Sequence, residues 1–461
     1  MTETFIQFAY LVAAFLFITA LRALGHPDSA RRGMHSAALG MLVAIIATLF
    51  EARIITYEWI ALGAVAGAVV GYPLGMWVPM TAMPQRIAFS HAFGALAATL
   101  VGVAEYLHSY GEAGLSAAQM TALGFEVLLG ALTVTGSIMA FAKLQGLLPG
   151  RPVTFRFQNM LNLGALVFVV ILLMALIYDP YRVDLFFVML CVSAAIGISL
   201  ILPIGGADMP VVVSLLNSYA GLAAVATGFA INNNILIIVG ALDGASGFIL
   251  SIAMSRAMNR SFSNVLFGAF GSSSVVATGT ESEGGEMAQV SAEDAALRLA
   301  FAGKVVVVPG YGLAVAQAQH QARELGDLIE KRGGEVRYAI HPVAGRMPGH
   351  MNVLLAEAGV PYDKLIEMDE INERFHETDV AVVVGANDVV NPAAGSNPAS
   401  PIYGMPILNV SDSRSVIVLK RGTGRGFSGV ENDLFFHSKT TMLFGDAKQS
   451  LIDLAVEVKG A

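Results

Sequence analysis

The segments 160–178, MLNLGALVFVVILLMALIY, and 184–202, DLFFVMLCVSAAIGISLIL, decide the fold of the N-terminal part of this chain. An α-helix needs about 20 mostly apolar residues to cross the hydrocarbon core of a bilayer, and both segments have this length. A short polar turn with Pro180 and Arg182 separates them. The two segments therefore predict a pair of membrane-spanning helices.

Outward from this pair, the same kind of segment recurs along the chain as far as residue 257. Together the predicted spans are residues 4–23, 33–50, 57–78, 85–108, 119–142, 160–178, 184–202, 209–229 and 234–257. The loops between them are too short to fold as domains. The first segment has no basic stretch before it and no obvious cleavage site, so it is interpreted as a span and not as a removed signal. We expect residues 1–260 to form a multi-pass α-helical membrane bundle with nine spans.

The composition divides the chain into two parts. Of its 461 residues, 55% are hydrophobic and only 13% are charged, against about 25% charged residues in soluble domains. Residues 1–260 hold 11 Lys/Arg and 11 Asp/Glu, and residues 261–461 hold the other 16 and 24, which carry the whole net charge of −8. An acidic soluble part argues against a nucleic-acid partner, because phosphate binding needs a basic face. One cysteine, Cys191, and no Cys/His cluster with zinc spacing predict neither a disulfide nor a metal site.

Basic residues gather in alternate loops of the predicted bundle. They are Arg22, Arg31, Arg32, Arg86, Lys143, Arg151, Arg156, Arg256 and Arg260. Loops rich in Lys and Arg stay in the cytoplasm. The sequence therefore predicts an outer N-terminus and a cytoplasmic C-terminal part.

Polar residues inside the predicted spans are candidates for function, because ionisable groups are costly in a bilayer. In four spans they share one helical face with small residues. These faces hold His91 with Gly94 and Gly102, Glu126 with Thr133 and Ser137, Asn217 with Ser214, and Asp243 with Gly247. Asp208 lies near the cytoplasmic start of the eighth span, and Ser246 is adjacent to the face of the ninth. Such stripes predict a narrow hydrated proton path. His91 is the preferred proton carrier, because an imidazole gains and loses a proton near neutral pH.

Structural alternatives stay open for these side chains. The imidazole, amide and hydroxyl groups also fit hydrogen bonds between helices, which contribute about 0.6 kcal/mol on average. The carboxylates lie toward the ends of their spans, where Glu126 in particular could simply be solvated at the outer surface.

The C-terminal part begins after a tether. Residues 271–290, GSSSVVATGTESEGGEMAQV, have the composition of a flexible segment, and residues 261–290 are expected to link two domains. Ser291 and the acids after it predict a helix start. Buried parallel strands are predicted at residues 304–309, 335–340, 381–384, 407–410, 416–419 and 441–444. Helical patterns separate most of them, so residues 291–461 are expected to form a Rossmann-like, doubly wound α/β domain.

The first predicted strand runs into Gly310-Tyr311-Gly312 and then a helix to about Lys331. This pattern is typical of a dinucleotide-binding turn, in which glycines allow a tight bend and the helix N-terminus offers N–H groups to a pyrophosphate. Val315 stands where a third Gly or Ala is usual. An ordinary structural turn is the alternative.

The charged residues of the predicted domain favour one of the two dinucleotides, NADP or NAD. No acid follows the second predicted strand, which ends at His341-Pro342, so the usual hold on the ribose of NAD is missing. A glycine-rich loop with Lys420, Arg421 and Arg425 follows a later strand. These cations can bind a 2′-phosphate through charge-assisted hydrogen bonds, although a solvated basic loop is the alternative. The chemistry favours NADP(H).

Several longer strings carry a family resemblance. They are ADMPVVVSLLNSY at 207–219, AMNRSF at 257–262, VAGRMPGHMNVLLAEA at 343–358, GANDVVNPAA at 385–394 and GVENDLFF at 429–436. They resemble the β subunit of proton-translocating NAD(P)⁺ transhydrogenase, and the likeness covers essentially the whole chain.

The resemblance implies a nine-span membrane domain with a cytosolic NADP(H) domain, in a bacterial inner membrane. It also implies a separate α subunit that carries the NAD(H) domain, an assembly with two copies of each half, and direct hydride transfer from NADH to NADP⁺ driven by protons that enter the cytoplasm. This chain has one nucleotide-binding turn, so it needs a partner for that reaction.

The resemblance also assigns residues. With Gly310 and Gly312 of the turn, the expected NADP(H) contacts are Tyr311, Val343, Ala344, Gly345, Arg346, Met347, Pro348, Gly385, Ala386, Asn387, Asp388, Val389, Gly404, Met405, Lys420, Arg421, Gly422, Thr423, Gly424, Arg425, Gly426, Phe427, Asp446 and Ala447. NADP lies reversed in this family, so Gly310 and Gly312 are expected to meet it differently from the usual turn. His91, Asn217, Asp208 and Gly247 are assigned to proton translocation and coupling, with Ser137 and Ser246 on the same faces. Asp388 is the family's acid near the nicotinamide end.

The hypothesis that follows links protonation of His91 to opening or closing of the 420–430 loop over NADP(H). A channel or transporter gated by a nucleotide-sensing domain is the main competitor, and it predicts a reversible ligand without hydride chemistry. A membrane anchor for a soluble dehydrogenase is another, but the sequence offers no second lobe for its substrate.

Overall fold

The computed structural model describes residues 2–51, 56–78, 82–110, 115–149, 153–205, 208–257, 287–345, 349–398, 400, 402–424, 426 and 428–461. Contacts divide the chain into two compact units, one with the residues up to Ile252 and one with the described residues from 287 onward. The predicted linker 261–290 lies outside the described residues except for its last four. The domain boundaries therefore remain predictions.

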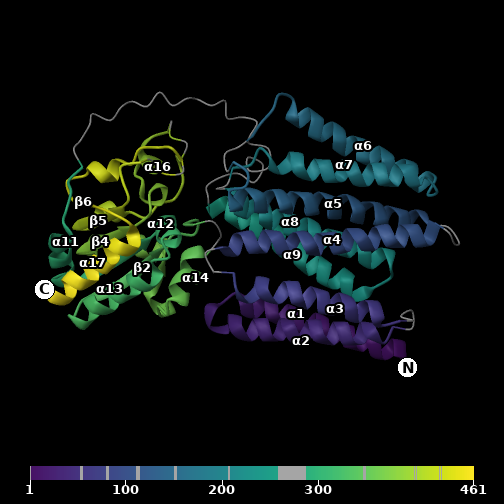
Figure 1. Ribbon diagram of the computed structural model, residues 1–461, viewed down its shortest axis with the longest axis horizontal. Coiled ribbons are helices and arrows are strands. Elements are labelled where there is room, and N and C mark those ends of the chain that lie inside the picture. Colours follow the sequence, from purple (N-terminus) through teal and green to yellow (C-terminus); the bar gives the residue numbers. More distant parts are fainter. Residues whose placement is uncertain are drawn as a thin grey trace. The chain divides into compact units, whose positions relative to one another are not determined.

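The regular elements that the structure describes in the first unit are all helices (Figure 1). Its helices are α1 Thr2–Leu24, α2 Pro27–Leu49, α3 Glu58–Met76, α4 Met83–Tyr110, α5 Ala117–Gln145, α6 Gln158–Tyr178, α7 Val183–Ile201, α8 Met209–Ala230 and α9 Asn234–Ala257. Among the described residues, nine helices are long and apolar enough to cross a membrane, which confirms the predicted spans. The largest difference is at α2, which starts at Pro27, because proline suits the first turn of a helix.

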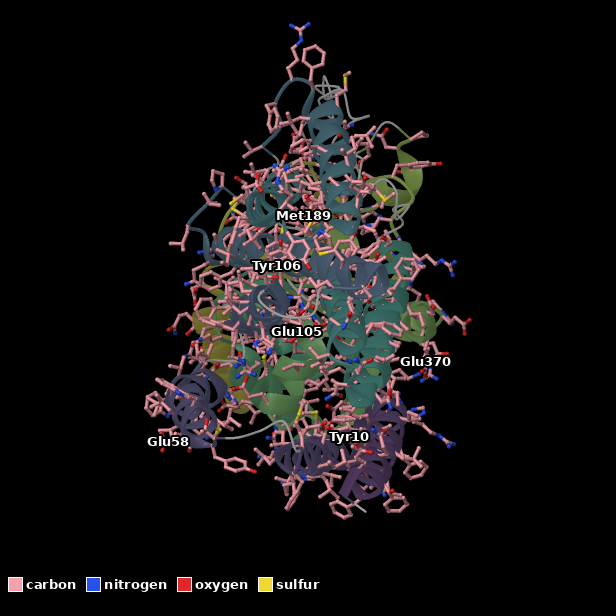
Figure 2. The ribbon with its side chains drawn as sticks, turned by 90° about the vertical axis from the view of Figure 1, so that its right-hand side faces the viewer. Tyr10, Glu58, Glu105, Tyr106, Met189 and Glu370 are labelled. Atoms are coloured by element: carbon pink, nitrogen blue, oxygen red, sulfur yellow. The ribbon has the colours of Figure 1, made fainter. Side chains whose placement is uncertain are left out.

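Helix α5 is the centre of this unit. It packs against α4, α7 and α8. Of its apolar stretch of 18 residues, 61% is buried, which is the largest share for any span among the described residues. At one end of α4 the Tyr106 ring stacks on Phe186 with centroids 3.8 Å apart, and its hydroxyl donates to the Pro180 carbonyl at 2.7 Å (Figure 2). Helices α1 and α2 form a hairpin, in which the Tyr10 and Thr48 hydroxyls are 2.9 Å apart, and Ile235 of α9 packs into its core.

Lys143 lies in the last turn of α5, beside the loop that it was expected to flank. Its side chain is buried, and its ammonium donates to the carbonyls of Ile201, Leu202 and Ile204 at 3.2, 2.5 and 2.8 Å. The last carbonyls of a helix lack partners within the helix and carry partial negative charge, so a cation stabilises this end of α7.

Helices α8 and α9 cross at a point where both helices have glycine residues. A Cβ atom placed on Gly221 would lie 2.3 Å from the Gly244 nitrogen, and one on Gly240 would lie 2.7 Å from the Gly221 carbonyl oxygen. The Ser214 hydroxyl donates to the Gly247 carbonyl at 2.9 Å. Small residues permit this backbone approach, which is how helices associate in lipid.

The second unit is a doubly wound α/β domain. Among the described residues its sheet has six parallel strands in the order β3-β2-β1-β4-β5-β6, formed by β1 Lys304–Pro309, β2 Glu335–Ile340, β3 Leu365–Glu367, β4 Val380–Val384, β5 Ser415–Lys420 and β6 Thr440–Phe444. The main helices are α11 Ala292–Ala300, α12 Tyr311–Val315, α13 Gln319–Lys331, α14 His350–Glu357, α15 Met368–Asn372, α16 Ala393–Ser396 and α17 Ala447–Gly460. This is the strand order of dinucleotide-binding folds, and it confirms the predicted fold class.

The core of this domain follows from its strands. All five residues of β4 are buried, and so are the four valines of β1. Runs of buried β-branched residues are expected where helices cover both faces of a parallel sheet. The core continues through Phe375, Leu408 and Phe435 on one side of the sheet.

Three local predictions were wrong. The strand expected at residues 407–410 is irregular, because its N–H groups go elsewhere: Leu408 N donates to the Val389 carbonyl and Asn409 N to the Asn372 side chain. The edge strand β3 was missed, since three residues are too few to show a pattern. The helix expected to run to Lys331 is broken near Gln317, which has a positive φ of 49°.

The N-terminal border of the domain extends slightly further than the expected start at 291. Gln289 pairs with Met442 in a parallel bridge, and Met442 N donates to the Ala288 carbonyl at 2.7 Å. Ser291 then caps α11, as predicted, by accepting from Asp294 N at 3.1 Å.

Candidate proton-transfer and nucleotide-binding sites

In the helical unit, the structure brings His91 and Ser137 together. His91 Nδ1 of α4 lies 2.9 Å from the Ser137 hydroxyl of α5. The other ring nitrogen, Nε2, is buried and has no hydrogen-bond partner among the described residues. The ring therefore has one occupied nitrogen and one available for a water molecule.

A second polar pair joins α8 and α9. Asn217 Nδ2 donates to the Asp243 carboxylate at 2.9 Å. Asp243 is also close enough to interact electrostatically with His91. Polar side chains of α4, α5, α8 and α9 thus form one cluster, which contains three of the predicted proton-path residues and Asp243.

The other predicted path residues have different positions. Gly247 packs on α8, where a Cβ atom would lie 2.8 Å from Ser218 N and 3.1 Å from Asn217 Nδ2. The Ser246 hydroxyl donates back to the Asp243 carbonyl of its own helix at 2.9 Å. Asp208 stands immediately before α8, nine residues and about 14 Å of helix from Asn217. It does not belong to the cluster.

In the α/β unit, the predicted cofactor residues converge at the carboxyl edge of the sheet. They follow β1 (Gly310, Tyr311, Gly312), β2 (Val343, Ala344, Gly345), β4 (Gly385 to Val389), β5 (Lys420 onward) and β6 (Asp446, Ala447). Ligands of doubly wound sheets bind at this edge, at the point between β1 and β4 where the strand order reverses. The predicted residues Arg346, Met347, Pro348, Arg425 and Phe427 lie outside the described residues.

Gly310 and Gly312 contact protein. Their N–H groups donate to the carbonyls of Val384 and Gly385 at 2.9 and 2.8 Å. A Cβ atom on Gly310 would lie 2.4 Å from the backbone of Ala386, and one on Gly312 would lie 2.6 Å from Gly385 Cα. These glycines let the loops after β1 and β4 touch, and α12 behind them has only five residues. The N–H groups of Gly310 and Gly312 are thus bonded within the protein, and the contact of these glycines with NADP(H) stays a prediction.

Asp388 fastens the loop that follows β5. Its carboxylate accepts from Ser428 N at 2.9 Å and from the Ser428 hydroxyl at 2.7 Å. Gly426 lies so close that a Cβ atom there would be 2.4 Å from Asp388 Oδ1. Deeper in, the buried Asn432 side chain donates to both oxygens of Asn387 at 3.0 Å. The 420–430 loop thus rests on the loop after β4.

Lys420 starts the 420–430 loop. Its ammonium donates to the Gly424 carbonyl and lies 4.5 Å from the centroid of the Phe435 ring. Burial lowers the pKa of Lys420, and the neighbouring Asp388 carboxylate opposes this shift. Arg421 beside it is exposed, and an added Cβ atom on Gly422 or Gly424 would meet nothing within 4 Å. Two cations on an open, glycine-rich loop fit a phosphate group.

His341 is a site residue whose role the sequence did not reveal. Its Nδ1 accepts from Val343 N at 3.2 Å and its Nε2 donates to the Pro406 carbonyl at 2.8 Å. Those bonds hold the ring in the neutral form with the proton on Nε2, and burial lowers its pKa. His341 ties the loop after β2 to the segment that contains Gly404 and Met405. A polar residue directly after a buried strand was the available signal.

Other predicted contacts are held by local structure. Gly345 has a φ of 106°, and a Cβ atom there would lie 2.2 Å from the His350 ring. Gly404 also has a positive φ, and its N–H donates to the Ala394 carbonyl at 2.7 Å. Asp446 caps α17 by accepting from Lys448 N and Gln449 N. Its side chain is therefore already engaged.

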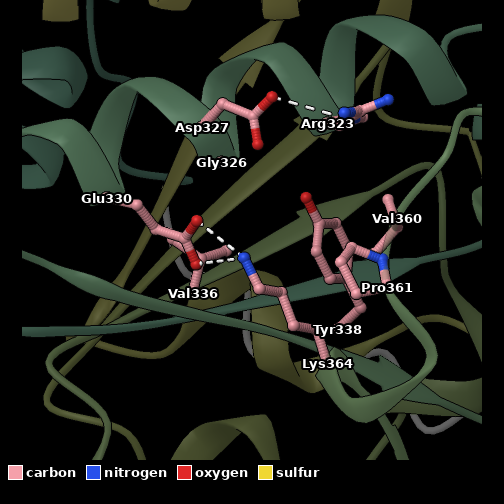
Figure 3. Close-up of a pocket in the computed structure, with 9 residues that line it drawn as sticks. All are labelled: Arg323, Gly326, Asp327, Glu330, Val336, Tyr338, Val360, Pro361 and Lys364. Atoms are coloured by element: carbon pink, nitrogen blue, oxygen red, sulfur yellow. Dashed lines mark hydrogen bonds and ion pairs between the residues drawn. The ribbon is translucent and has the colours of Figure 1, made fainter.

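A surface hollow elsewhere in the domain does not involve the candidate residues (Figure 3). It lies between α13 and β2, where the Lys364 ammonium and the Glu330 carboxylate form two contacts of 2.6 and 2.7 Å. No group of three His, Cys, Asp or Glu able to hold a metal occurs in the described part of the chain.

The sequence is similar to known proteins over nearly its whole length. The profile of the family described as NAD(P) transhydrogenase beta subunit matches residues 6–457. The NAD(P) transhydrogenase subunit beta of Rhodospirillum rubrum is 49% identical over 455 residues, which cover 97% of this chain and 98% of that relative. The subunit of the same name from a specified strain of this organism matches with the same identity and coverage.

Proposed function

Because the chain belongs to the family of NAD(P) transhydrogenase beta subunits, we propose that it is the NADP(H)-binding, proton-conducting subunit of a complex that transfers a hydride directly from NADH to NADP⁺. Proton movement across the membrane into the cytoplasm accompanies this transfer. The NAD(H) site belongs to an α subunit, and the working assembly contains a second copy of each half. The helical unit lies in a bacterial inner membrane with the α/β unit on the cytoplasmic side.

The observation that carries the nucleotide part of this proposal is the basic 420–430 loop, fastened by Asp388 over the carboxyl edge of the sheet. Lys420 and Arg421 bind the 2′-phosphate of NADP(H), which distinguishes it from NAD(H). The bound nicotinamide ring supplies the hydride chemistry. The chain itself binds the dinucleotide, orients it and excludes water from it.

Asp388 is proposed to control the 420–430 loop. As a carboxylate it accepts two hydrogen bonds from Ser428. A proton on that carboxyl group would turn one acceptor oxygen into a donor that faces the Ser428 hydroxyl or N–H, and the loop would loosen. Binding and release of NADP(H) would thereby depend on protonation.

The membrane part of the proposal rests on the polar cluster of α4, α5, α8 and α9. His91 exchanges the proton, Ser137 orients the ring, and Asn217 with Asp243 places a carboxylate near it. Ionisable groups in membrane helices generally mark ion or proton pathways. Protonation there is proposed to reach the 420–430 loop, because hydride exchange between two similar nicotinamides provides little driving force by itself.

Calorimetry on residues 287–461 tests the assignment of the cofactor. This segment contains the whole described sheet and the 288–290 pairing with β6. We expect tight binding of NADP(H), weak binding of NAD(H), and loss of NADP(H) binding in the double variant Lys420→Ala/Arg421→Ala. Arg332→Ala, far from the sheet's carboxyl edge at the end of α13, is the matched control. Equal affinity for both dinucleotides would favour the nucleotide-gated channel.

A further inference from the structure

Glu126 of α5 is a buried carboxyl group that the proposed function has not used. Its side chain is 0% exposed, and neither carboxylate oxygen has a hydrogen-bond partner among the described residues. It fits against α4 because residue 102 is glycine: a Cβ atom there would lie 2.8 Å from the Glu126 carboxyl carbon and 3.0 and 3.1 Å from its oxygens. Solvation at the outer surface, the simple expectation from sequence, is ruled out.

Glu126 begins a row of unsatisfied polar atoms along the contact between α4 and α5. The row comprises Glu126 Oε1 and Oε2, Thr133 Oγ1, His91 Nε2 and Gln85 Oε1, all of them buried and without a partner in the part of the chain that the structure describes. We call this row the α4–α5 seam.

The antiparallel packing of α4 and α5 places the members of the seam in order. Glu126 lies on Gly102, Gly130 lies on Thr99 with 2.4 Å between an added Cβ atom and the threonine hydroxyl, and Ser137 bonds to His91. Residues 126, 130, 133 and 137 follow the spacing of one helix face. Glu126 and Ser137 are eleven residues apart, or about 16 Å along the helix.

Buried polar side chains nearly always have hydrogen-bond partners, so a row of unsatisfied ones requires an explanation. Ordered water is the usual partner of such groups, at about three hydrogen bonds per molecule. An ionised carboxylate without a partner is very costly inside a membrane, so Glu126 carries a proton unless water or a cation reaches it. The α4–α5 seam therefore has polar groups that can hydrogen-bond to a single-file row of water molecules (a water file). It also has a proton-binding group, Glu126, at one end.

Two polar groups lie close to the Glu126 carboxyl group, the Thr227 side chain and the backbone of Gly102, although neither meets the geometry of a hydrogen bond to its oxygens. Thr227 of α8 lies beside the carboxyl group, but its hydroxyl donates to the Ala223 carbonyl at 3.0 Å. Glu105 of α4 interacts with Glu126 as a like charge and lies next to Tyr106 at the same end of α4 (Figure 2).

We propose that Glu126 is a proton-binding residue for translocation, and that water along the α4–α5 seam connects it to His91. This inference rests on the proposed function and adds the step before His91. A proton from water on the side of the α5 N-terminus converts the carboxylate to the acid. The acid then gives a proton to the water file, which passes it by way of the Thr133 hydroxyl to His91 Nε2, and the carboxylate is restored. No electrons move.

Proton pumping by the complete complex in sealed vesicles tests the role of Glu126. In Glu126→Gln, which keeps size and shape, we expect NADP(H) binding by the complex to be unchanged and pumping to fall by about tenfold or more, as is typical when a positioned proton carrier is removed. Glu126→Asp should restore part of the rate. Glu58→Gln, in the exposed first turn of α3, is the control and should pump at close to the wild-type rate. Wild-type pumping by Glu126→Gln would overturn the proposal.

A second pair of variants tests the seam without changing a charge. Thr133→Val removes the unsatisfied hydroxyl and should slow pumping several-fold. Thr135→Val is its control on the other side of α5, where the hydroxyl donates to the Ala194 carbonyl at 2.7 Å, and it should have little effect. Equal rates in the two variants would contradict a water file along the α4–α5 seam, even if Glu126→Gln fails to assemble.

Infrared difference spectroscopy separates this proposal from the proposed function. Wild-type protein should show the carbonyl band of a protonated carboxyl group that shifts in deuterated water and is absent in Glu126→Gln. If the wild-type complex transfers no hydride, the proposed function fails, while this band still shows whether Glu126 binds a proton. Proton pumping by wild-type protein that shows no such band would contradict the proposed role of Glu126 and leave the proposed function intact.

Discussion

A single carboxylate at the nucleotide edge determines how the 420–430 loop is held. Asp388 accepts two hydrogen bonds from one residue of that loop, Ser428. Hydrogen bonds to a charged acceptor contribute about 1.5–3 kcal/mol each. At the scale of one residue, the position of the loop is therefore sensitive to the charge of this side chain.

Asp388→Asn should weaken NADP(H) binding, because the amide offers one acceptor and one donor where two acceptors stood. A loss of about 1.4 kcal/mol raises the Kd about tenfold, and isothermal calorimetry on residues 287–461 would measure it. Ser428→Ala removes only the hydroxyl and leaves the backbone N–H bond, so its effect should be smaller. A larger effect of Ser428→Ala than of Asp388→Asn would argue against control by the carboxylate.

His341 should make the stability of the α/β unit dependent on pH. Its folded pKa is lowered by burial, so the unfolded state binds more protons as the pH falls through the ordinary histidine value of about 6.5. The contribution of His341 to stability is therefore complete above that pH and is lost below it. The melting temperature of residues 287–461 should fall between about pH 7.5 and 5.5, and His341→Asn should flatten this fall. The exposed His376 is the control, and His376→Asn should leave the slope unchanged.

At the scale of elements, the contact of α8 with α9 sets the geometry of part of the proposed proton path. Backbone atoms of Gly221 and Gly244 come closer than any side chain would permit. That approach places Asn217 and Asp243 within a 2.9 Å hydrogen bond. The glycines therefore position the polar pair indirectly.

Gly221→Leu should separate α8 from α9, break the bond from Asn217 to Asp243 and abolish most of the proton pumping. Overpacking of this kind costs about 1–3 kcal/mol, so the variant should still insert. Gly94→Leu is the control within α4, because an added Cβ atom there meets nothing within 4 Å. Pumping assays in sealed vesicles would compare them, and equal loss in both variants would show a general folding defect instead.

Sequence patterns predicted the helices and strands that follow from local composition. They did not predict structure that depends on hydrogen bonds to segments distant in sequence. Membrane helices were predictable because length and apolar content define them, and the strands β1, β2, β4, β5 and β6 because buried parallel strands are continuous apolar runs. The segment 407–410 has the same run of apolar residues, but its N–H groups bond to the loop after β4 and to Asn372. No local pattern distinguishes these two outcomes.

The candidate sites were predictable to the same extent. Position after a strand predicted Lys420, and the family resemblance predicted Asp388, but neither showed that Asp388 holds Ser428, forty residues away in sequence. The burial of Glu126 was also invisible, because it depends on Gly102 from another helix. Tertiary contacts of this kind require the fold.

At the scale of the whole molecule, the proposed proton path and the proposed nucleotide site belong to different compact units. The described residues contain one six-stranded sheet of the dinucleotide-binding type. We therefore expect hydride exchange between two dinucleotides to require a second protein.

The purified chain alone should bind NADP(H) and catalyse no transfer of hydride from NADH. Addition of the NAD(H)-binding α subunit should restore transfer, which absorbance of a thio- or acetylpyridine dinucleotide analogue would follow. His91→Ala in the restored complex should lose proton pumping, whereas Ser90→Ala, an exposed neighbour on α4, should keep it. Hydride transfer by the isolated chain would contradict the proposal that the NAD(H) site belongs to the α subunit.

The burial of Lys143 has a practical consequence for experiments that map how such a chain is threaded through a membrane. During biosynthesis a lysine at this position counts as a positive charge that stays on the cytoplasmic side. In the folded protein its ammonium is enclosed by three carbonyl oxygens. An impermeant amine-acylating reagent will therefore leave Lys143 unlabelled from both faces of the membrane, and trypsin will not cleave after it. Labelling and proteolysis experiments would therefore not detect Lys143, although its charge contributes to the orientation that they are meant to determine.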